Sequence, residues 1–432
     1  MRLALSLAII GSGWAGLAAA VRATQAGHKV TVLEMSGQLG GRARGVKVEG
    51  LALDNGQHIL IGAYHRTLAL LGTVGCDVRR AFDRRPLEIR YPDGRGLRVP
   101  PGPPWLGFAR AVLGCRGWNT RDRFSLLAAA AGWALAGFRC APQLSVDQLC
   151  RGLSPAVRQL LIDPLCVAAL NTPAPHASAA VLLRVLRDAL FSGPGSADLL
   201  LPRVSLGALL PLPAQRWLLE QGVALHTGCR VSLIEPAAGG GWWVDGERFE
   251  AVILACTATE AARLTQDIAP AWSQRAQALR YEPIVTVYLR CPTARLPAPM
   301  TALVEGPQAP AQFAFDHGAL GATPGLFAFV ISGAQGWLDV GLPAIGEAVL
   351  QQANEAFAPG TWPSPPTLLR VLAEKRATFR CTPGLDRPPA AIAAGLLAAG
   401  DYVAGPYPAT LEGAVRAGEQ AAAALGRRSI TN

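Results

Sequence analysis

The sequence predicts an α/β protein built on a Rossmann-like nucleotide-binding domain, accompanied by a second domain of mixed α and β structure. Three observations lead to this class. Residues 7–16 form an apolar strand that runs into a G-x-G-x-x-G turn. A second apolar run, 29–33, ends at the acidic residue Glu34. Near the end of the chain, the apolar segment 395–402 contains another glycine followed by an acid. The first two features together predict a dinucleotide-binding βαβ unit.

Each residue of this unit has a physical task. Gly11 allows the tight turn, Gly13 lets the backbone approach a pyrophosphate, and Gly16 lets the following helix lie close to the sheet. The predicted alanine-rich helix 15–25 presents its N-terminus to the phosphates. Glu34 is placed to accept hydrogen bonds from an adenosine ribose, and an acid suits an unphosphorylated ribose better than a 2′-phosphate.

The first ten residues also imitate a secretory signal, because a charged start is followed by an apolar stretch. Cleavage of such a signal would remove the strand that enters the dinucleotide turn. We therefore expect the N-terminus to be retained and the protein to be cytoplasmic.

Composition narrows the possible classes. A chain of 432 residues predicts two domains. Its nine cysteines include no C-x-x-C pair, and its six histidines have no metal-binding spacing, so we predict reduced thiols and no metal. The formal charge of +10 is spread along the chain rather than gathered into a run. This distribution argues against nucleic acid and favours an anionic membrane surface.

The second domain is predicted to begin near Cys76 with short strands, followed by the proline-rich break 100–104. It continues into the uncharged run 124–138, which has arginines on both sides. This run is shorter than the ~20 residues needed to span a bilayer. It could be a buried helix or a helix lying at a membrane surface, and we favour core packing because burial is the commoner fate.

Residues 222–256 again have the pattern of apolar strands expected of the nucleotide-binding domain. They include a predicted strand at 228–234 and a hairpin whose turn is Asp245-Gly246. Apolar stretches at 284–289 and 313–331 predict a second sheet. These signals define two discontinuous domains. The nucleotide-binding domain is expected at 1–75, 205–280 and 381–432, and the substrate-binding domain at 76–204 and 281–380.

Two further motifs extend the nucleotide site. The pair Gly40-Gly41 allows a close backbone approach to the pyrophosphate, and the guanidinium of Arg42 offers paired donors to phosphate oxygens. Later in the chain Gly400-Asp401 precedes a helix that starts near Thr410. We expect this second half of the site to meet the cofactor from the opposite side.

This set of motifs resembles the amine oxidase and phytoene desaturase superfamily of flavoproteins. The resemblance implies that the chain binds FAD in a discontinuous, glutathione reductase type domain. More narrowly, residues 53–58, 164–173, 315–318 and 374–379 resemble the hydroxysqualene dehydroxylase family, and the resemblance covers nearly the whole chain. That family uses FAD to convert hydroxysqualene to squalene for hopanoid synthesis.

The resemblance also implies which residues bind the cofactor. One group of residues, from Gly11 to Val231 in the set given below, is implied to hold the adenosine and the pyrophosphate, and Val231 is implied to contact adenine through its backbone. A second group, from Gly56 to Leu411 in the same set, is implied to surround the ribityl chain and the isoalloxazine. Where the family commonly has Gly-Asp-Trp-Thr, this chain has Gly-Asp-Tyr-Val at 400–403. The expected set is Gly11, Gly13, Trp14, Ala15, Gly16, Glu34, Gly41, Arg42 and Val231, followed by Gly56, Gln57, Gly400, Asp401, Thr410 and Leu411.

The implied reaction removes the hydroxyl of an allylic alcohol as water and replaces it with a hydride from the flavin. The protein must then supply an apolar tunnel, a proton donor and exclusion of water. The sequence does not single out a catalytic residue. His58, Asp163 and His317 are candidate proton donors, and each of these residue types is more often structural.

Three rivals remain open. A carotenoid-type desaturase would use the same cofactor in the opposite redox direction, an amine oxidase would oxidise an amine, and a non-catalytic flavoprotein would dock on the membrane and present an isoprenoid. No second G-x-G-x-x-G in a convincing context names an electron donor or reductase partner. Because the substrate is a long-chain isoprenoid, we expect peripheral attachment at the inner face of the cytoplasmic membrane.

Overall fold

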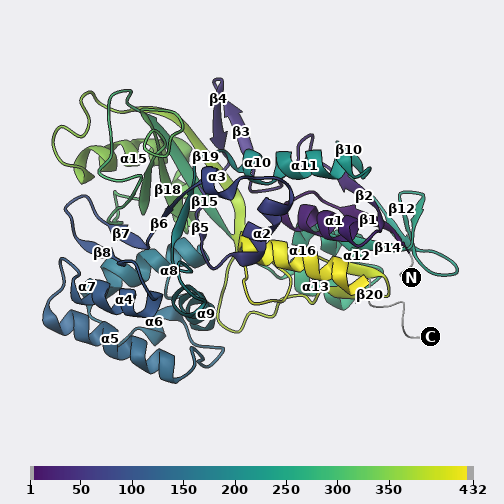
Figure 1. The fold of residues 1–432 in the computed structure, drawn as a ribbon, viewed down its shortest axis with the longest axis horizontal. Helices are drawn as coiled ribbons and strands as arrows, with labels where there is room; N and C mark the ends of the chain where they lie inside the picture. Colours follow the sequence, from purple (N-terminus) through teal and green to yellow (C-terminus); the bar gives the residue numbers. More distant parts are fainter. Residues whose placement is uncertain (1–3, 426–432) are drawn as a thin grey trace.

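The computed structural model describes residues 4–425 and is organised around two sheets (Figure 1). The larger sheet brings together strands from three distant parts of the chain. Its strands are parallel except for the last, which is antiparallel to its neighbour. The prediction of a Rossmann-like α/β fold is confirmed. The strand order is β10 (Ala224–Thr227), β2 (Lys29–Glu34), β1 (Ser6–Ile10), β14 (Ala251–Leu254), β21 (Leu396–Ala398) and β20 (Ala391–Ala393).

Strand β1 is apolar on both sides because both faces of the sheet are covered. Leu7 and Ile9 pack with the helices α1 (Trp14–Gln25) and α16 (Leu411–Leu425). Ala8 and Ile10 belong to a second core that reaches into the rest of the molecule. The N-terminal and C-terminal helices therefore lie side by side on one face of the sheet, as Figure 1 shows.

The second sheet is antiparallel. One face packs against α14 (Gln335–Val340) and α15 (Leu342–Ala356). The other face, which carries Tyr288, Phe313 and Phe315, joins the core shared with the helical part of the chain. The strands predicted at 284–289 and 313–331 lie here. Their order is β16 (Met300–Ala302), β17 (Phe313–Asp316), β18 (Leu326–Ser332), β15 (Tyr281–Arg290) and β19 (Thr367–Phe379).

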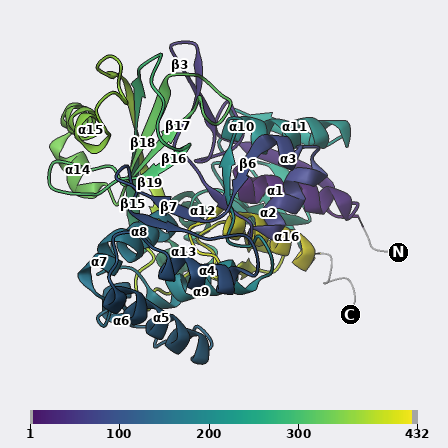
Figure 2. The same cartoon turned by 60° about the vertical axis from the view of Figure 1, so that its left-hand side comes forward.

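A group of helices lies next to this sheet, in the lower left of Figure 1, and Figure 2 shows the same neighbourhood from another side. A short π-helix, η1 (Arg158–Ile162), runs directly into one of these helices. The helices are α4 (Pro104–Leu113), α5 (Thr120–Leu135), α6 (Val146–Leu149), α7 (Pro155–Val157), α8 (Asp163–Leu170) and α9 (Ala179–Phe191).

The remaining elements connect these parts. Three small sheets are formed by β3 (Gly45–Val48) with β4 (Leu51–Asp54), by β5 (Leu60–Ile61), β9 (Leu199–Pro202) and β6 (Phe82–Arg85), and by β7 (Glu88–Arg90) with β8 (Gly96–Arg98). The remaining helices are α2 (His65–Thr73), α3 (Val78–Ala81), α10 (Leu206–Leu209), α11 (Pro211–Glu220), α12 (Ala258–Thr265) and α13 (Pro270–Gln277). The domain boundaries given above stay a prediction.

The hairpin predicted around Asp245-Gly246 is present as β12 (Trp242–Val244) and β13 (Glu247–Phe249), next to β11 (Ile234–Pro236). Both turn residues have positive φ, 46° and 87°, as a tight hairpin turn requires. The strand predicted at 228–234 is wrong apart from its last residue. Its backbone N–H groups at Ser232 and Leu233 bind the Asp245 carboxylate instead of a neighbouring strand.

The uncharged run 124–138 does not pack in the core as we expected. Within α5, only Asp122 and Leu126 are buried, and Phe124 and Leu135 are 62% and 90% exposed. Leu127, Ala129 and Trp133 are partly buried against the core, so one face of the helix packs on the protein and the opposite face is exposed. Within residues 4–425, no helix has both the length and the hydropathy required to cross a membrane.

The crossing of α1 and α16 depends on Gly418. A Cβ atom at this position would lie 2.1 Å from the carbonyl oxygen of Ala15. We predict that Gly418→Ala lowers the free energy of unfolding by about 1–3 kcal/mol, because the two helix backbones must separate. Gly132→Ala is the matched control, since nothing lies within 4 Å of a Cβ there and alanine favours a helix.

Urea unfolding of both variants, followed by circular dichroism, checks this prediction. The control should be as stable as the original protein or slightly more stable. Equal stability of Gly418→Ala and Gly132→Ala would contradict the packing argument.

Candidate functional site: a dinucleotide cradle

The dinucleotide turn is a place where backbones approach each other without side chains. Gly11 has a φ of +103°, and its N–H donates to the carbonyl of Leu33 over 2.8 Å. A Cβ on Gly16 would lie 1.9 Å from the Gly11 carbonyl oxygen. A Cβ on Gly41 would lie 3.1 Å from the Cα of Gly13. The roles predicted for these glycines therefore agree with the geometry of the turn.

The N-terminus of α1 opens onto this turn. Gly13 is its N-cap, no side chain caps the helix, and its first turn contains no acid. The amides of Trp14, Ala15 and Gly16 thus stand at the positive end of the helix dipole. Such an end binds a phosphate group readily. The Trp14 side chain has another task, since its indole N–H donates to the carbonyl of Ala43 over 3.0 Å and holds the adjoining loop.

Glu34 fastens the turn to the end of β2. Its Oε2 accepts hydrogen bonds from the N–H and the hydroxyl of Ser12, both over 2.7 Å. Its Oε1 accepts from the N–H of Ser36 over 2.7 Å. The residue expected to bind a ribose therefore also supports the turn, and this structural task was not visible in the sequence.

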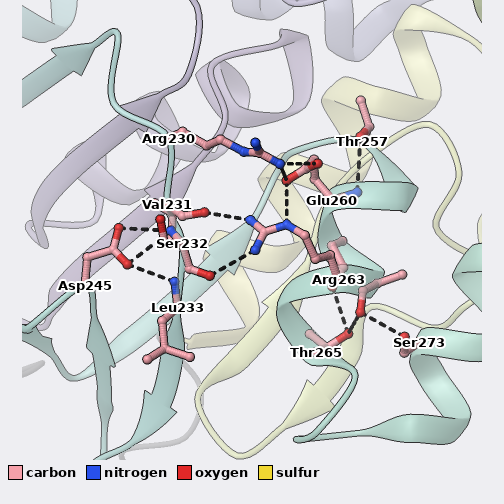
Figure 3. A network of polar contacts seen from close by, with 12 residues as sticks. Arg230, Val231, Ser232, Leu233, Asp245, Thr257, Glu260, Arg263, Thr265 and Ser273 are labelled. Carbon is pink, nitrogen blue, oxygen red and sulfur yellow. Dashed lines mark hydrogen bonds and ion pairs between the residues drawn. The ribbon is translucent and has the colours of Figure 1, made fainter.

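Val231 lies in the loop that replaces the expected strand. This loop is tied to the end of β2, because the N–H of Cys229 donates to the carbonyl of Glu34 over 2.8 Å. Figure 3 shows the guanidinium of Arg263 donating to the carbonyls of Val231 and Ser232, over 2.7 and 2.9 Å. The structure therefore brings Val231 and Glu34 together, with one hydrogen bond already made to the Val231 carbonyl.

Arg42 connects the two halves of the site. Its Nη2 lies 2.6 Å from Oδ1 of Asp401, and its Nη1 donates to the carbonyl of Ala377 over 2.7 Å. Asp401 is only 8% exposed and follows Gly400 at the end of β21. Residues far apart in sequence, which we expected to meet at one cofactor, thus meet in an ion pair.

The last helix begins beside this pair. The hydroxyl of Thr410 accepts from the N–H of Gly413 over 2.9 Å, so it caps α16, which starts at Leu411. Glu412 is fully buried and accepts from the N–H groups of Arg66 and Thr67 over 3.2 and 2.9 Å. This carboxylate caps α2 from another part of the chain and so sets the position of the α16 N-terminus.

The loop at Gly56 and Gln57 adds unpartnered polar atoms. A Cβ on Gly56 would lie 4.0 Å from Oγ1 of Thr286. Within residues 4–425, Oε1 of Gln57, Oγ1 of Thr286 and the hydroxyl of Tyr402 are buried and have no hydrogen-bond partner. Buried polar atoms are nearly always paired, so the unpartnered atoms of Gln57 and Thr286, on either side of Gly56, indicate a place for a polar ligand. Thr286 belongs to no motif that would have pointed to it, and the motif at 400–403 contains Tyr402 without indicating that its hydroxyl is unpartnered.

These features fit FAD. The open helix end and the glycine contacts suit a pyrophosphate, Arg42 adds a positive charge, and the unpartnered atoms suit a hydroxylated chain with a polar ring. The residues that would hold the cofactor come from β1, α1, β2, the loop at Gly56 and the start of α16.

Asp54 is a further buried acid at this site. It is 6% exposed, and its Oδ1 accepts from the N–H of Leu206 over 2.8 Å. The hydroxyl of Tyr288 clamps its backbone, with 3.0 Å to the Asp54 carbonyl oxygen. Burial raises the pKa of the Asp54 carboxyl to about 7. Asp54 was part of the motif at 53–58, but nothing in the sequence marked it as perturbed.

The three candidate proton donors lie at three different positions. His58 is next to Gly56, with its Nδ1 2.7 Å from the Gly56 carbonyl oxygen, and burial lowers its pKa. The His317 ring lies 5.9 Å from that of Tyr288, and burial lowers its pKa to about 4. Asp163 begins α8, has a buried Oδ1 with no partner in the described chain, and has a pKa raised by burial.

The chain matches the sequence profile of flavin containing amine oxidoreductases over residues 14–426 and belongs to that family. Its cofactor is FAD, and it is an oxidoreductase. Among solved structures, the fold is similar to an oxidoreductase from Methanosarcina mazei, with a TM-score of 0.72, 17% identity and coverage of 96% of this chain and 99% of that one. It is also similar to putrescine oxidase, with a TM-score of 0.71, 17% identity and coverage of 99% and 100%.

The chain is also similar in sequence to proteins of more specific activity within this family. The chain is 28% identical to a hydroxysqualene dehydroxylase of Rhodopseudomonas palustris, covering 96% of both chains. It is 29% identical to the hydroxysqualene dehydroxylase of Zymomonas mobilis, covering 96% of this chain and 97% of the relative. A zeta-carotene desaturase of Capsicum annuum is 27% identical over 56% of this chain and 44% of its own length.

The Arg42 pair yields a test of the cradle. We predict that Arg42→Gln raises the dissociation constant for FAD at least tenfold, because the phosphate loses a cation and the buried Asp401 loses its partner. Arg90→Gln removes an exposed arginine paired with Glu88 and is the control. Titration of the apoprotein with FAD, followed by flavin fluorescence, measures both. Equal affinities for the two variants would contradict the assignment.

Asp54 yields a prediction about pH. A carboxyl whose pKa is raised on folding favours the protonated form, so its ionisation weakens the fold as pH rises from about 4 to about 7. Asp54→Asn stays neutral and keeps an acceptor for Leu206. We predict that the variant is about 1–3 kcal/mol more stable than the original at pH 8 and equally stable at pH 4.

Urea unfolding at the two pH values measures this difference, and Asp386→Asn is the control because the Asp386 side chain is 71% exposed. The prediction fails if Asp54→Asn shows the same small effect at both pH values as the control.

Proposed function

We propose that this flavoprotein converts hydroxysqualene to squalene. The observation that carries the proposal is the similarity to named hydroxysqualene dehydroxylases along 96% of the chain, whereas the similarity to the zeta-carotene desaturase covers 56%. The motifs at 164–173 and 315–318 lie in the part that contains the second sheet and the helices, where a substrate rather than the cofactor is expected to bind.

The reaction breaks one C–O bond and forms one C–H bond, and the oxygen leaves as water. FAD, when bound in its reduced form, supplies the hydride. The protein must supply one proton to the leaving hydroxyl and must keep water away from the allylic cation that forms. An electron donor returns FAD to its reduced form between turnovers.

We expect the C30 hydrocarbon chain to bind in the apolar region between the second sheet and the helices. Phe313, Phe315 and Val330 face it from the sheet, and Leu161 and Leu170 face it from η1 and α8. All five are buried. We assign the substrate to this side of the sheet, because Thr286, which lies near Gly56 of the cofactor site, is on the same face of β15 as Tyr288.

We assign the proton donor to Asp163. The lowered pKa values of His58 and His317 leave both imidazoles neutral near pH 7, so neither carries an acidic proton. Burial favours the protonated form of Asp163 instead. Its Oδ1 is buried with no hydrogen-bond partner in the described chain, and the charged neighbours of its half-buried side chain are Arg158 and Asp147, which pair with each other.

The substrate also implies where the protein works. A C30 isoprenoid alcohol partitions into lipid rather than water. The protein therefore acts at the inner face of the cytoplasmic membrane as a peripheral protein.

The role of Asp163 has a clear kinetic consequence. We predict that Asp163→Asn lowers the turnover rate about 10²–10⁴-fold, the usual contribution of a general acid, while flavin content is unchanged. In the original protein, the rate should fall as pH rises through the raised pKa of Asp163. Measurement of kcat between pH 5 and 9 for the original protein, Asp163→Asn and Asp163→Glu checks this. A rate for Asp163→Asn within threefold of the original at neutral pH would remove Asp163 from the mechanism.

Product analysis tests the proposed reaction. The holoenzyme is supplied with a chemical reductant and hydroxysqualene, and separately, without reductant, with squalene or phytoene. Mass spectrometry should find squalene in the first reaction and no new double bonds in the others. Conjugated products from phytoene, with hydroxysqualene unchanged, would replace this proposal with the desaturase.

A further inference from the structure

Helix α5 has an apolar stripe that the fold leaves uncovered. Phe124, Ala128, Ala131 and Leu135 recur at the spacing of one helix face, and all four are exposed. Phe124 is 62% and Leu135 90% exposed. In Figures 1 and 2, α5 lies at the outer edge of the helical part, away from both sheets. We call these four residues the α5 stripe. A solvent-exposed apolar face of this kind indicates an interaction site.

The stripe continues beyond the end of the helix. The ring of Phe138 lies 5.4 Å from the ring of Phe191 at the end of α9, and Phe191 is 52% exposed. Two elements thus add apolar surface next to Leu135. From Phe124 to Phe138 the chain contains no charged residue, so no charge on this segment opposes its burial in lipid.

The charges around the stripe are positive. Residues 93–147 contain seven arginines and three acids, a net charge of +4, and one of these acids, Asp93, pairs with Arg95. Asp122 is buried and closes a capping box with Asn119 at the start of α5. Arg110, Arg116, Arg121 and Arg139 are exposed and form no ion pair with any residue in the described range 4–425. Arg121 and Arg139 stand on either side of the α5 stripe.

We propose that the α5 stripe is the surface by which the protein docks on an anionic phospholipid bilayer. Helix α5 is too short to span the membrane, and the uncharged run 124–138 has arginines on both sides. A helix of this kind lies in the plane of the interface, with its apolar face among the acyl chains and its arginines at the phosphates. This inference rests on the proposed function, because that function makes the membrane the source of the substrate. The new content is the surface that docks and the anionic charge of the lipid.

Sedimentation with vesicles tests the docking surface. Full-length, FAD-loaded protein is mixed with vesicles of phosphatidylglycerol and phosphatidylcholine, or of phosphatidylcholine alone. We expect stronger binding to the anionic vesicles, and weakening by salt. The double variant Phe124→Glu with Leu135→Glu should lose at least tenfold in binding. Arg121→Gln should lose about fivefold on anionic vesicles only.

The matched control changes two exposed apolar residues elsewhere, Val340→Glu with Leu219→Glu, which are 66% and 54% exposed. Its binding should stay within twofold of the original. Melting temperature and flavin content verify that both double variants are folded. Equal binding by the α5 variant and the control would overturn the proposal. Failure of the original protein to bind either vesicle, or an α5 variant that only dissociates a dimer in the absence of lipid, would also overturn it.

Turnover of detergent-dispersed hydroxysqualene separates this inference from the proposed function. The α5 variant should keep the original rate in detergent, because the substrate then needs no membrane. Vesicle binding without turnover by the original protein would contradict the proposed reaction and leave the docking surface in place. Turnover without vesicle binding would contradict the docking surface and leave the proposed reaction in place.

Discussion

The structure depends on one constraint: backbone segments must cross without side chains between them. Gly16 lies against the Gly11 carbonyl, Gly41 against Gly13, and Gly418 against Ala15. These contacts keep α1 close to the sheet and α16 close to α1. They also leave the N-terminus of α1 open toward the turn, and an open helix end is what a pyrophosphate requires. The same absence of side chains therefore serves both folding and cofactor binding.

Much of this half of the molecule could be predicted because its signals are local. The strand at β1, the glycine turn, Glu34 and the Asp245-Gly246 hairpin are each written in a few adjacent residues. What the sequence could not predict depends on distant partners. The loop at Val231 is held by Arg263 and Asp245 rather than by a strand, and Arg42 meets Asp401 through the folded sheet. Thr286 was missed because burial, rather than a motif, makes it distinctive. The motifs that contain Tyr402 and Asp54 could not show that burial leaves the Tyr402 hydroxyl unpartnered and raises the pKa of the Asp54 carboxyl.

Helix α5 shows the limit of hydropathy. Its apolar run suggested a core helix, yet only Leu126 among its apolar side chains is fully buried, and Leu127, Ala129 and Trp133 are only partly buried. Hydropathy indicates how favourable it is to remove a helix from water, but not whether the helix packs against protein or against lipid. In this chain, the uncovered helix and the apolar core behind the second sheet belong to the same helical part.

We propose that reduced FAD in this cradle is oxidised by hydroxysqualene. An anaerobic titration tests this directly: photoreduced holoenzyme receives hydroxysqualene, flavin absorbance is followed, and the lipid is extracted at each step. We expect one squalene to form for each flavin oxidised. Flavin that stays reduced while hydroxysqualene is bound, or flavin oxidised without squalene, would contradict it.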